Sequence, residues 1–493
     1  MAETASTPPP ATRAQPGRAA FAESGWLIGA GAALLLLAVA LFDPRLLNDG
    51  DTYWHLAAGD WMIGHGQVPH TDPFSFTRAG APWQAHEWLS EVLMAAAFRL
   101  GGWCGVVTLY GVALAGLALL LTGGLRRYLS GLSLALTLAL ALACAAPNLL
   151  ARPHVLILPL VVAWTVALLQ ARAAGRAPPL PASGLMLLWA NLHGSFVFGF
   201  LLLAGFALEA LHEAPTADRW RVLRDWGLFG LACLAAASIT PQGPMGLIFP
   251  FKLMGMTSLA GIDEWRATDF SKPGPFEIAL AVALFVGLSR GAKVRPIRLM
   301  MLIGLLHMAL QHNRHIMIAA LVAALLLAEP FAAALGQPRP EARPARPGAG
   351  LALAGLALAL IAARGALPLT RPDGPTTPGA ALEHVPPALR ARPVLNDYGF
   401  GGYLIFRGVR PFVDGRTDLF GDAFMRRYYQ ITSPDPVALD QALTRYGIAW
   451  TILPPGAPAV ALMDTRPGWR RLYADRFAVV HVRTEPPASA GAR

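Results

Sequence analysis

The sequence predicts a polytopic α-helical membrane protein with about eleven transmembrane helices and a soluble C-terminal α/β domain. Of its 493 residues, 55% are hydrophobic and only 14% are charged, whereas soluble domains carry about 25% charged residues. The apolar residues come in long blocks, as membrane spans do. From about residue 380, short apolar runs instead alternate with helical patterns, which is typical of an α/β layer.

The predicted spans occupy roughly residues 24–42, 103–122, 129–146, 154–170, 181–193, 195–211, 226–240, 276–290, 297–311, 315–333 and 350–366. The fifth and sixth are shorter than the roughly 20 residues that a full crossing requires, so we expect tilted or broken helices there. The domains that follow from this pattern are a disordered tail (1–22), a transmembrane domain (23–367), an α/β domain (368–484) and a second disordered tail (485–493).

The basic residues predict the orientation of the chain. Among the loops that connect the spans, the arginines concentrate in alternate ones, for example at Arg126, Arg127 and Arg295, and the positive-inside rule places those loops in the cytoplasm. The N-terminus is then cytoplasmic. The two long loops, 43–102 and 242–275, and the C-terminal domain are then extracytoplasmic. The net charge is +10, but the arginines are dispersed rather than gathered on one face, so we expect no nucleic-acid partner.

Two carboxylates follow the first span directly. Asp49 and Asp51 flank a glycine at the start of the first long loop. Such a pair can hold a divalent metal, for which Mg²⁺ or Mn²⁺ is the expectation, or one carboxylate can act as a general base. The alternative interpretation is that Asp51 or Thr52 caps a helix predicted over residues 53–63.

The same loop continues with a second titratable group. His86 and Glu87 lie between Trp83 and Trp88, at the start of a helix predicted over residues 87–100. Interfacial tryptophans are common, and this helix can simply lie along the membrane surface. However, so many titratable groups in one loop of a chain this poor in charge favour a functional site.

Polar residues also interrupt the spans. Asn191 and His193 lie at the junction of the two short spans, where a substrate-binding role and an interhelical hydrogen bond are equally supported. Arg152, Arg314 and His315 lie at the ends of spans where few positive charges are expected. A guanidinium there is suited to bind the phosphate of a lipid-linked substrate.

Two further candidates lie in the second long loop and the C-terminal domain. Glu264 lies on the same side of the membrane as Arg314, either in a site or as a solvated acid of an interfacial helix. Asp414, Arg416 and Asp418 follow a strand predicted at 411–413. The carboxyl ends of strands in α/β sheets bind ligands, although an Asp–Arg pair that braces the turn explains the pattern equally simply.

Several motifs resemble those of a known superfamily. They are Asp51-Thr-Tyr-Trp-His-Leu, Asp72-Pro-Phe-Ser, Trp83 through Leu89, Gly401-Gly-Tyr-Leu-Ile and Phe412-Val-Asp-Gly-Arg. The chain resembles, over nearly all of residues 24–484, bacterial multipass proteins of the C-type (GT-C) glycosyltransferase superfamily. Its characterised members include oligosaccharyltransferase catalytic subunits and protein mannosyltransferases.

The resemblance implies a GT-C-like membrane glycosyltransferase of a bacterial inner (plasma) membrane. Its partners would be the lipid bilayer, a polyprenyl-phosphate-linked sugar and an acceptor that is a lipid, a glycan or a protein. Asp49 and Asp51 occupy the place of the essential acidic motif, so Asp51 is the expected catalytic carboxylate. The alternatives are a transporter or flippase of a lipid-linked saccharide and a non-catalytic subunit of envelope assembly.

Overall fold

The computed structural model describes residues 16–338, 340 and 347–484. A helix coincides with each of the eleven predicted spans. They are α1 (Pro16–Phe42), α3 (Trp88–Leu125), α4 (Gly131–Ala145), α6 (Leu158–Ala173), α7 (Gly184–Leu192), α8 (Phe196–Glu213), α9 (Arg219–Ala237), α11 (Pro275–Ser289), α12 (Pro296–Gln311), α13 (Ile316–Ala334) and α14 (Pro347–Ala366). The predicted helical membrane architecture is therefore confirmed.

The lengths of these helices support membrane insertion. In the described part of the chain, 7 helices are long and apolar enough to cross a membrane, and three apolar helices are shorter. The short α7 has 9 residues, a length of about 14 Å, so it cannot cross alone. Helix α1 begins at Pro16, so residues 16–22 are helical rather than part of a disordered tail. The other predicted tail, 485–493, lies outside the described residues.

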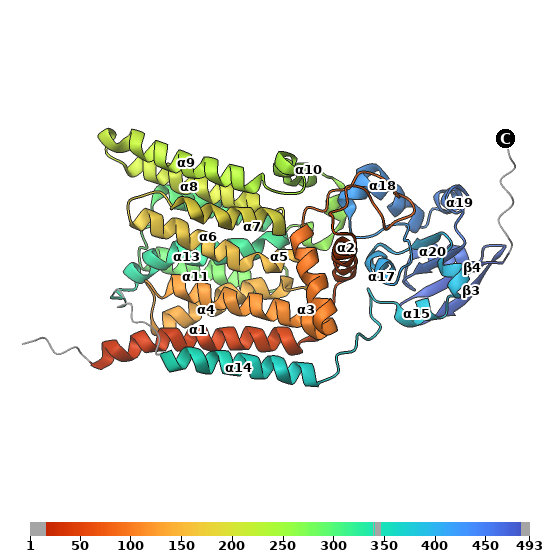
Figure 1. The fold of residues 1–493 in the computed structure, drawn as a ribbon, viewed down its shortest axis with the longest axis horizontal. Coiled ribbons are helices and arrows are strands. Elements are labelled where there is room, and N and C mark those ends of the chain that lie inside the picture. Colours follow the sequence, from red (N-terminus) through yellow and green to blue (C-terminus); the bar gives the residue numbers. More distant parts are fainter. Residues whose placement is uncertain (1–15, 339, 341–346, 485–493) are drawn as a thin grey trace, which may run out of the picture.

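Both long loops and the C-terminal domain lie at one end of the helical bundle, which we call the domain end. Figure 1 shows α2 (Asp51–His65) and α10 (Phe249–Met254) between this end and the distal domain, residues 368–484. Helix α14 delivers the chain to that domain from the same end (Figure 1). The loops and the distal domain therefore share one side of the bundle.

Glycines set the shape of the first long loop. Helix α2 ends at Gly66, whose φ of 66° closes the helix in the left-handed region that favours glycine. Helix α3 is broken by Gly101 and by Gly102, which has a φ of 56°. The part before this break lies across the domain end of the bundle (Figure 1), in agreement with the helix predicted over 87–100.

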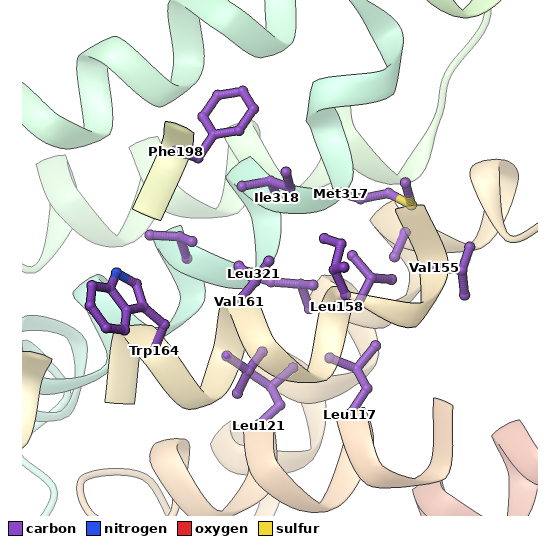
Figure 2. Close-up of a cluster of buried hydrophobic side chains, with 14 of the residues drawn as sticks. Leu117, Leu121, Val155, Leu158, Val161, Trp164, Phe198, Met317, Ile318 and Leu321 are labelled. Carbon is purple, nitrogen blue, oxygen red and sulfur yellow. The ribbon is translucent and has the colours of Figure 1, made fainter. Parts of the chain in front are cut away.

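The bundle is held together by one large apolar core. Figure 2 shows a part of it in which Leu117 and Leu121 from α3 pack near Leu158 and Val161 from α6. Leu321 from α13 completes this group and is fully buried. Because side chains from three helices close this layer, the core also forms a rigid floor beneath the domain end.

The distal domain contains a small mixed sheet. Its strands are β1 (Val394–Asn396), β2 (Trp450–Leu453), β3 (Trp469–Ala474) and β4 (Val479–Arg483), in the order β1-β2-β4-β3. Strands β1 and β2 are parallel and the other pairs are antiparallel. The helices of the domain are α15 (Gly379–Glu383), α16 (Pro387–Arg390), α17 (Gly401–Phe406), α18 (Thr417–Thr432), α19 (Pro436–Arg445) and α20 (Pro458–Asp464).

Two strand assignments differ from the prediction. Residues 411–413 are not a strand, because their backbone leads directly into the turn that carries Asp414. Strand β3 was missed because it is a half-exposed edge strand whose arginines, Arg470 and Arg471, hide the apolar alternation. Charged edge strands of this kind protect a sheet from pairing with other chains.

The distal domain and the first long loop share one core and one buried ion-pair network. Trp54, Trp83 and the distal Phe412 belong to the same apolar cluster. At its centre the fully buried Arg416 donates from Nη2 to Asp414 at 2.7 Å and from Nη1 to Asp72 at 2.7 Å. The bracing interpretation of this motif is therefore correct, and Arg416 is not available to a ligand.

We predict that Arg416→Ala destabilises this junction by about 3–5 kcal/mol, because it leaves two carboxylates buried without a cation. The measurement is the thermal unfolding of the detergent-solubilised protein, together with the rate of proteolysis within residues 368–484. The control is Arg470→Ala on the exposed edge strand. Equal unfolding temperatures for the two variants would contradict the role given to Arg416.

Candidate active site

A pocket lies between the two long loops and the helix ends at the domain end of the bundle. Its apolar side is built from Leu158, Phe198, Met317 and Ile318, which belong to the core shown in Figure 2. The pocket also brings together six of the polar residues singled out from the sequence: His86, Glu87, His193, Glu264, Arg314 and His315. An apolar floor with a polar roof suits a ligand that is part lipid and part polar.

Arg152 is the centre of a charge network beside this pocket. Its Nε and Nη2 atoms lie 2.5 Å and 2.6 Å from the two carboxylate oxygens of Asp49. Nη2 also lies 2.8 Å from Asp51, and Nη1 lies 3.0 Å from Glu264. The guanidinium of Arg152 is thus shared by three carboxylates, so it orders the acidic residues rather than offering itself to a phosphate.

Glu264 extends this network into the pocket. Its second oxygen lies 3.2 Å from Nη1 of Arg314, whose guanidinium lies 4.5 Å from the ring centre of Trp265. Burial opposes ionisation, but the charges of Arg152 and Arg314 outweigh it and lower the pKa of Glu264 to about 2. Arg314 lines the pocket and pairs with one carboxylate among the described residues, so it is the arginine best placed to bind an anionic group there.

Asp51 is the first residue of α2, and the helix has no side-chain cap at Gly50. The capping interpretation of Asp51 and Thr52 is therefore wrong. Thr52 instead donates from its hydroxyl to the backbone carbonyl of Ala151 at 3.1 Å. Burial raises the pKa of Asp51 to about 7, and the charge of Arg152 limits the rise. A carboxylate with a pKa near neutrality is suited to accept a proton from a substrate.

The backbone of the distal domain packs directly against Asp51. A Cβ added to Gly415 would lie 1.9 Å from Oδ1 of Asp51, and one added to Gly402 would lie 2.2 Å from the carbonyl oxygen of Gly50. Only glycine fits such approaches. The turn after Phe412 therefore forms a wall of the site, whereas the sequence suggested either a separate ligand site or a braced turn there.

Glu87 is surrounded by histidines from three segments. Its Oε1 lies 3.1 Å from Nε2 of His193 and 3.7 Å from Nε2 of His86, and its Oε2 lies 3.9 Å from Nε2 of His55. The backbone N–H of Ser195 donates to Nδ1 of His193 at 3.0 Å, so the proton of this imidazole is on Nε2 and points at Glu87.

Three other predicted residues have mainly structural contacts. The amide of Asn191 accepts from Nε1 of Trp88 at 2.8 Å and donates to two backbone carbonyls, which agrees with the packing interpretation. The ring of His315 packs against Phe198 at 5.3 Å while lining the pocket. Burial raises the pKa of Asp418, which lies close enough to His86 for the two charges to interact.

The pair of Asp49 and Asp51 does not fit a divalent metal in this arrangement. Both carboxylates already accept from the guanidinium of Arg152, so the space between them contains a cation of the chain itself. A metal ion there would have to compete with this charge at close range. We therefore derive no chemical step from a metal at this pair.

The structure also adds residues that sequence reasoning did not choose. His55 and Glu91 are both buried and contact each other through Nδ1 and Oε1 at 3.2 Å. His154 lines the pocket, with its ring 6.4 Å from that of His193. The sequence contained a signal for His55, which lies one helical turn after Asp51, but its partner became visible only with the packing of α2 on α3.

No protein-family model matches the chain, and no curated protein does. Among solved structures, the apo oligosaccharyltransferase of Archaeoglobus fulgidus aligns with 88% of this chain and 69% of its own length, at 12% identity and a TM-score of 0.51. The chain therefore shares the fold of this oligosaccharyltransferase. ArnT from Cupriavidus metallidurans, bound to undecaprenyl phosphate, aligns with 95% of this chain and 99% of its own, at 14% identity and a TM-score of 0.47. The apo state of the same ArnT aligns with 93% of this chain and 98% of its own, at 15% identity and a TM-score of 0.47.

We predict that Gly415→Ala displaces the Asp51 carboxylate, because the added methyl group cannot share its space. Whatever activity depends on Asp51 should fall by roughly 100-fold, the cost of misplacing a reacting group by about 1 Å. The matched control is Gly456→Ala, where an added Cβ meets nothing within 4 Å. If both variants keep the wild-type rate in a turnover assay, the distal domain does not position Asp51.

Proposed function

We propose that this chain is a membrane glycosyltransferase that uses a polyprenyl-phosphate-linked sugar as its donor. One observation carries the proposal: a pocket with an apolar floor is lined by the guanidinium of Arg314, and it lies near a carboxylate, Asp51, whose burial suits it to proton transfer. The GT-C fold is consistent with this activity, although a fold hosts many functions.

Each part of such a donor has a counterpart in the pocket. The isoprenoid chain would lie against the apolar floor. The phosphate would bind the guanidinium of Arg314 and replace part of its ion pair with Glu264. The sugar would lie below the first long loop, near His86 and Glu87. This places the C1 atom of the sugar between the arginine and the acidic side of the site.

The proposed reaction is a single displacement at C1. The acceptor hydroxyl oxygen forms a bond with C1 while the bond between C1 and the phosphate oxygen breaks. The proton of that hydroxyl passes to Asp51, and the lipid phosphate leaves with the bonding electrons. Arg314 would stabilise the negative charge on the leaving phosphate.

We further infer that the chemistry takes place on the extracytoplasmic side of a bacterial inner membrane. The arginine-rich loops between alternate spans support a cytoplasmic N-terminus. The domain end is then extracytoplasmic, and it carries the pocket.

The alternatives have less support. A flippase would need a substrate site at mid-membrane around Asn191, but that amide is saturated by protein partners. An assembly subunit would offer the surface around Arg416, but this side chain is buried.

We predict that Asp51→Asn lowers sugar transfer by about 10²–10⁴-fold, because general-base catalysis contributes that much. Purified wild type and variant are compared in detergent with a panel of radiolabelled polyprenyl-phosphate sugars. Asp60→Asn is the control, since Asp60 is on the same helix, is exposed, and pairs only with Arg99 among the described residues. Full activity of Asp51→Asn would remove Asp51 from the mechanism.

We also predict that transfer rises with pH through about 7 and then reaches a plateau. Burial raises the pKa of Asp51 to about 7, so the carboxylate is protonated, and unable to accept a proton, below that value. The charged groups that face this carboxylate are Arg152, which opposes the rise of its pKa, and Asp49 and Glu264, which add to it. The measurement is kcat/KM from pH 5 to 9; a profile already flat at pH 5 would show that the base has an ordinary pKa.

A further inference from the structure

A second group of titratable residues lies around Glu87, which lines the pocket. His55 from α2, Glu87 just before α3 and Glu91 in its first turn each present a ligand atom, and these atoms all lie within 4.8 Å of one another. We call these three residues the carboxylate–histidine cluster. All three side chains are largely buried, with 4%, 12% and 1% exposure respectively.

In the described part of the chain, no arginine or lysine forms an ion pair with this cluster. Among the described residues, the ion-pair partners of Glu87 and Glu91 are histidines only. His55 lies between the two carboxylates, with Nδ1 3.2 Å from Oε1 of Glu91 and Nε2 3.9 Å from Oε2 of Glu87. Two carboxylates buried at such short range without a cation are costly.

One atom of the cluster also lacks any partner. The Oε2 atom of Glu91 is buried and accepts no hydrogen bond from the described residues, and the whole residue is 1% exposed. Buried polar atoms are nearly always satisfied, so an unsatisfied carboxylate oxygen indicates a group that the protein chain does not supply. Because Glu91 belongs to the cluster, the missing group is expected there.

We propose that His55, Glu87 and Glu91 form a binding site for a divalent transition-metal ion, with Zn²⁺ as the best match. One imidazole nitrogen and two carboxylates are a donor set that zinc accepts, with bonds of about 2.0–2.2 Å. The Nδ1 atom of His55 and Oε1 of Glu91 are 3.2 Å apart, close to the separation of about 3.3 Å that a tetrahedron with such bonds requires.

The position of the cluster gives the ion a defined task. It would join α2, through His55, to α3, through Glu91, where the two helices already pack so closely that a Cβ on Gly59 would lie 1.9 Å from the carbonyl oxygen of Glu91. The same helix α2 begins with Asp51. The ion would therefore fix the element that carries Asp51, and through Glu87 it would face the pocket.

This site is distinct from the metal expected at Asp49 and Asp51, where Arg152 supplies the positive charge. It also does not depend on the proposed glycosyl transfer, since metal binding can be measured without any donor. The competing arrangement is a cluster that shares protons in place of a metal ion, and this is one outcome of the test.

The experiment is a zinc titration of the full-length protein in detergent, after removal of any histidine tag and treatment with a chelator. Wild type, Glu91→Gln and His55→Gln are compared by calorimetry, with Asp60→Asn on α2 as the control. We expect one Zn²⁺ per chain in wild type and control, and an affinity lower by at least about tenfold in both cluster variants. Zn²⁺ should raise the unfolding temperature of wild type and of Asp60→Asn, and not that of the two cluster variants.

A second measurement identifies the ligands if either variant folds poorly. Co²⁺ replaces Zn²⁺, and its visible absorption bands report a four-coordinate nitrogen–oxygen site in wild type. A wild type that takes up no stoichiometric metal would overturn the proposal in favour of shared protons. Uptake that is equal in wild type and in a folded Glu91→Gln variant would also overturn it, because the ion would then lie elsewhere.

Discussion

The arrangement of the domain end depends on the pairing of Arg152 with Asp49, Asp51 and Glu264. These four residues come from the first long loop, the turn before α5 (Pro153–Leu156) and the second long loop. At the edge of a membrane the dielectric constant is low, so an unpaired charge there costs much free energy. For the same reason the attraction between paired charges is strong. One guanidinium thus fixes three segments that no apolar contact alone would align.

The distal domain is the second constraint on the site. Its core is continuous with that of the first long loop, and its turn at Gly415 closes over Asp51. An Asp422 side chain also accepts from the backbone of Thr257 and Ser258 in the second long loop. A loop of about sixty residues would otherwise sample many conformations. The domain therefore acts as a lid that is built into the fold, rather than as an independent module.

The sequence was informative wherever the signal was local. Apolar blocks located every membrane helix, and the scarcity of charge made Glu87, Glu264 and Arg314 conspicuous before any geometry was known. Tertiary contacts were not readable in the same way. Nothing local distinguishes Arg152, which pairs with carboxylates, from Arg314, which faces the pocket, or shows that Gly415 touches Asp51. Strand β3 was hidden because its exposed arginines disrupt the alternation that defines a strand.

Helix α2 connects these features physically. Asp51 and His55 lie one helical turn apart, so any rotation of α2 moves both together. Asp51 is held at one end by Arg152 and Gly415, and His55 is held one turn later by Glu91. A helix anchored at two points on one face has little freedom to turn, which is the preorganisation that electrostatic catalysis needs. The contact between His55 and Glu91 therefore limits the movement of Asp51 as well.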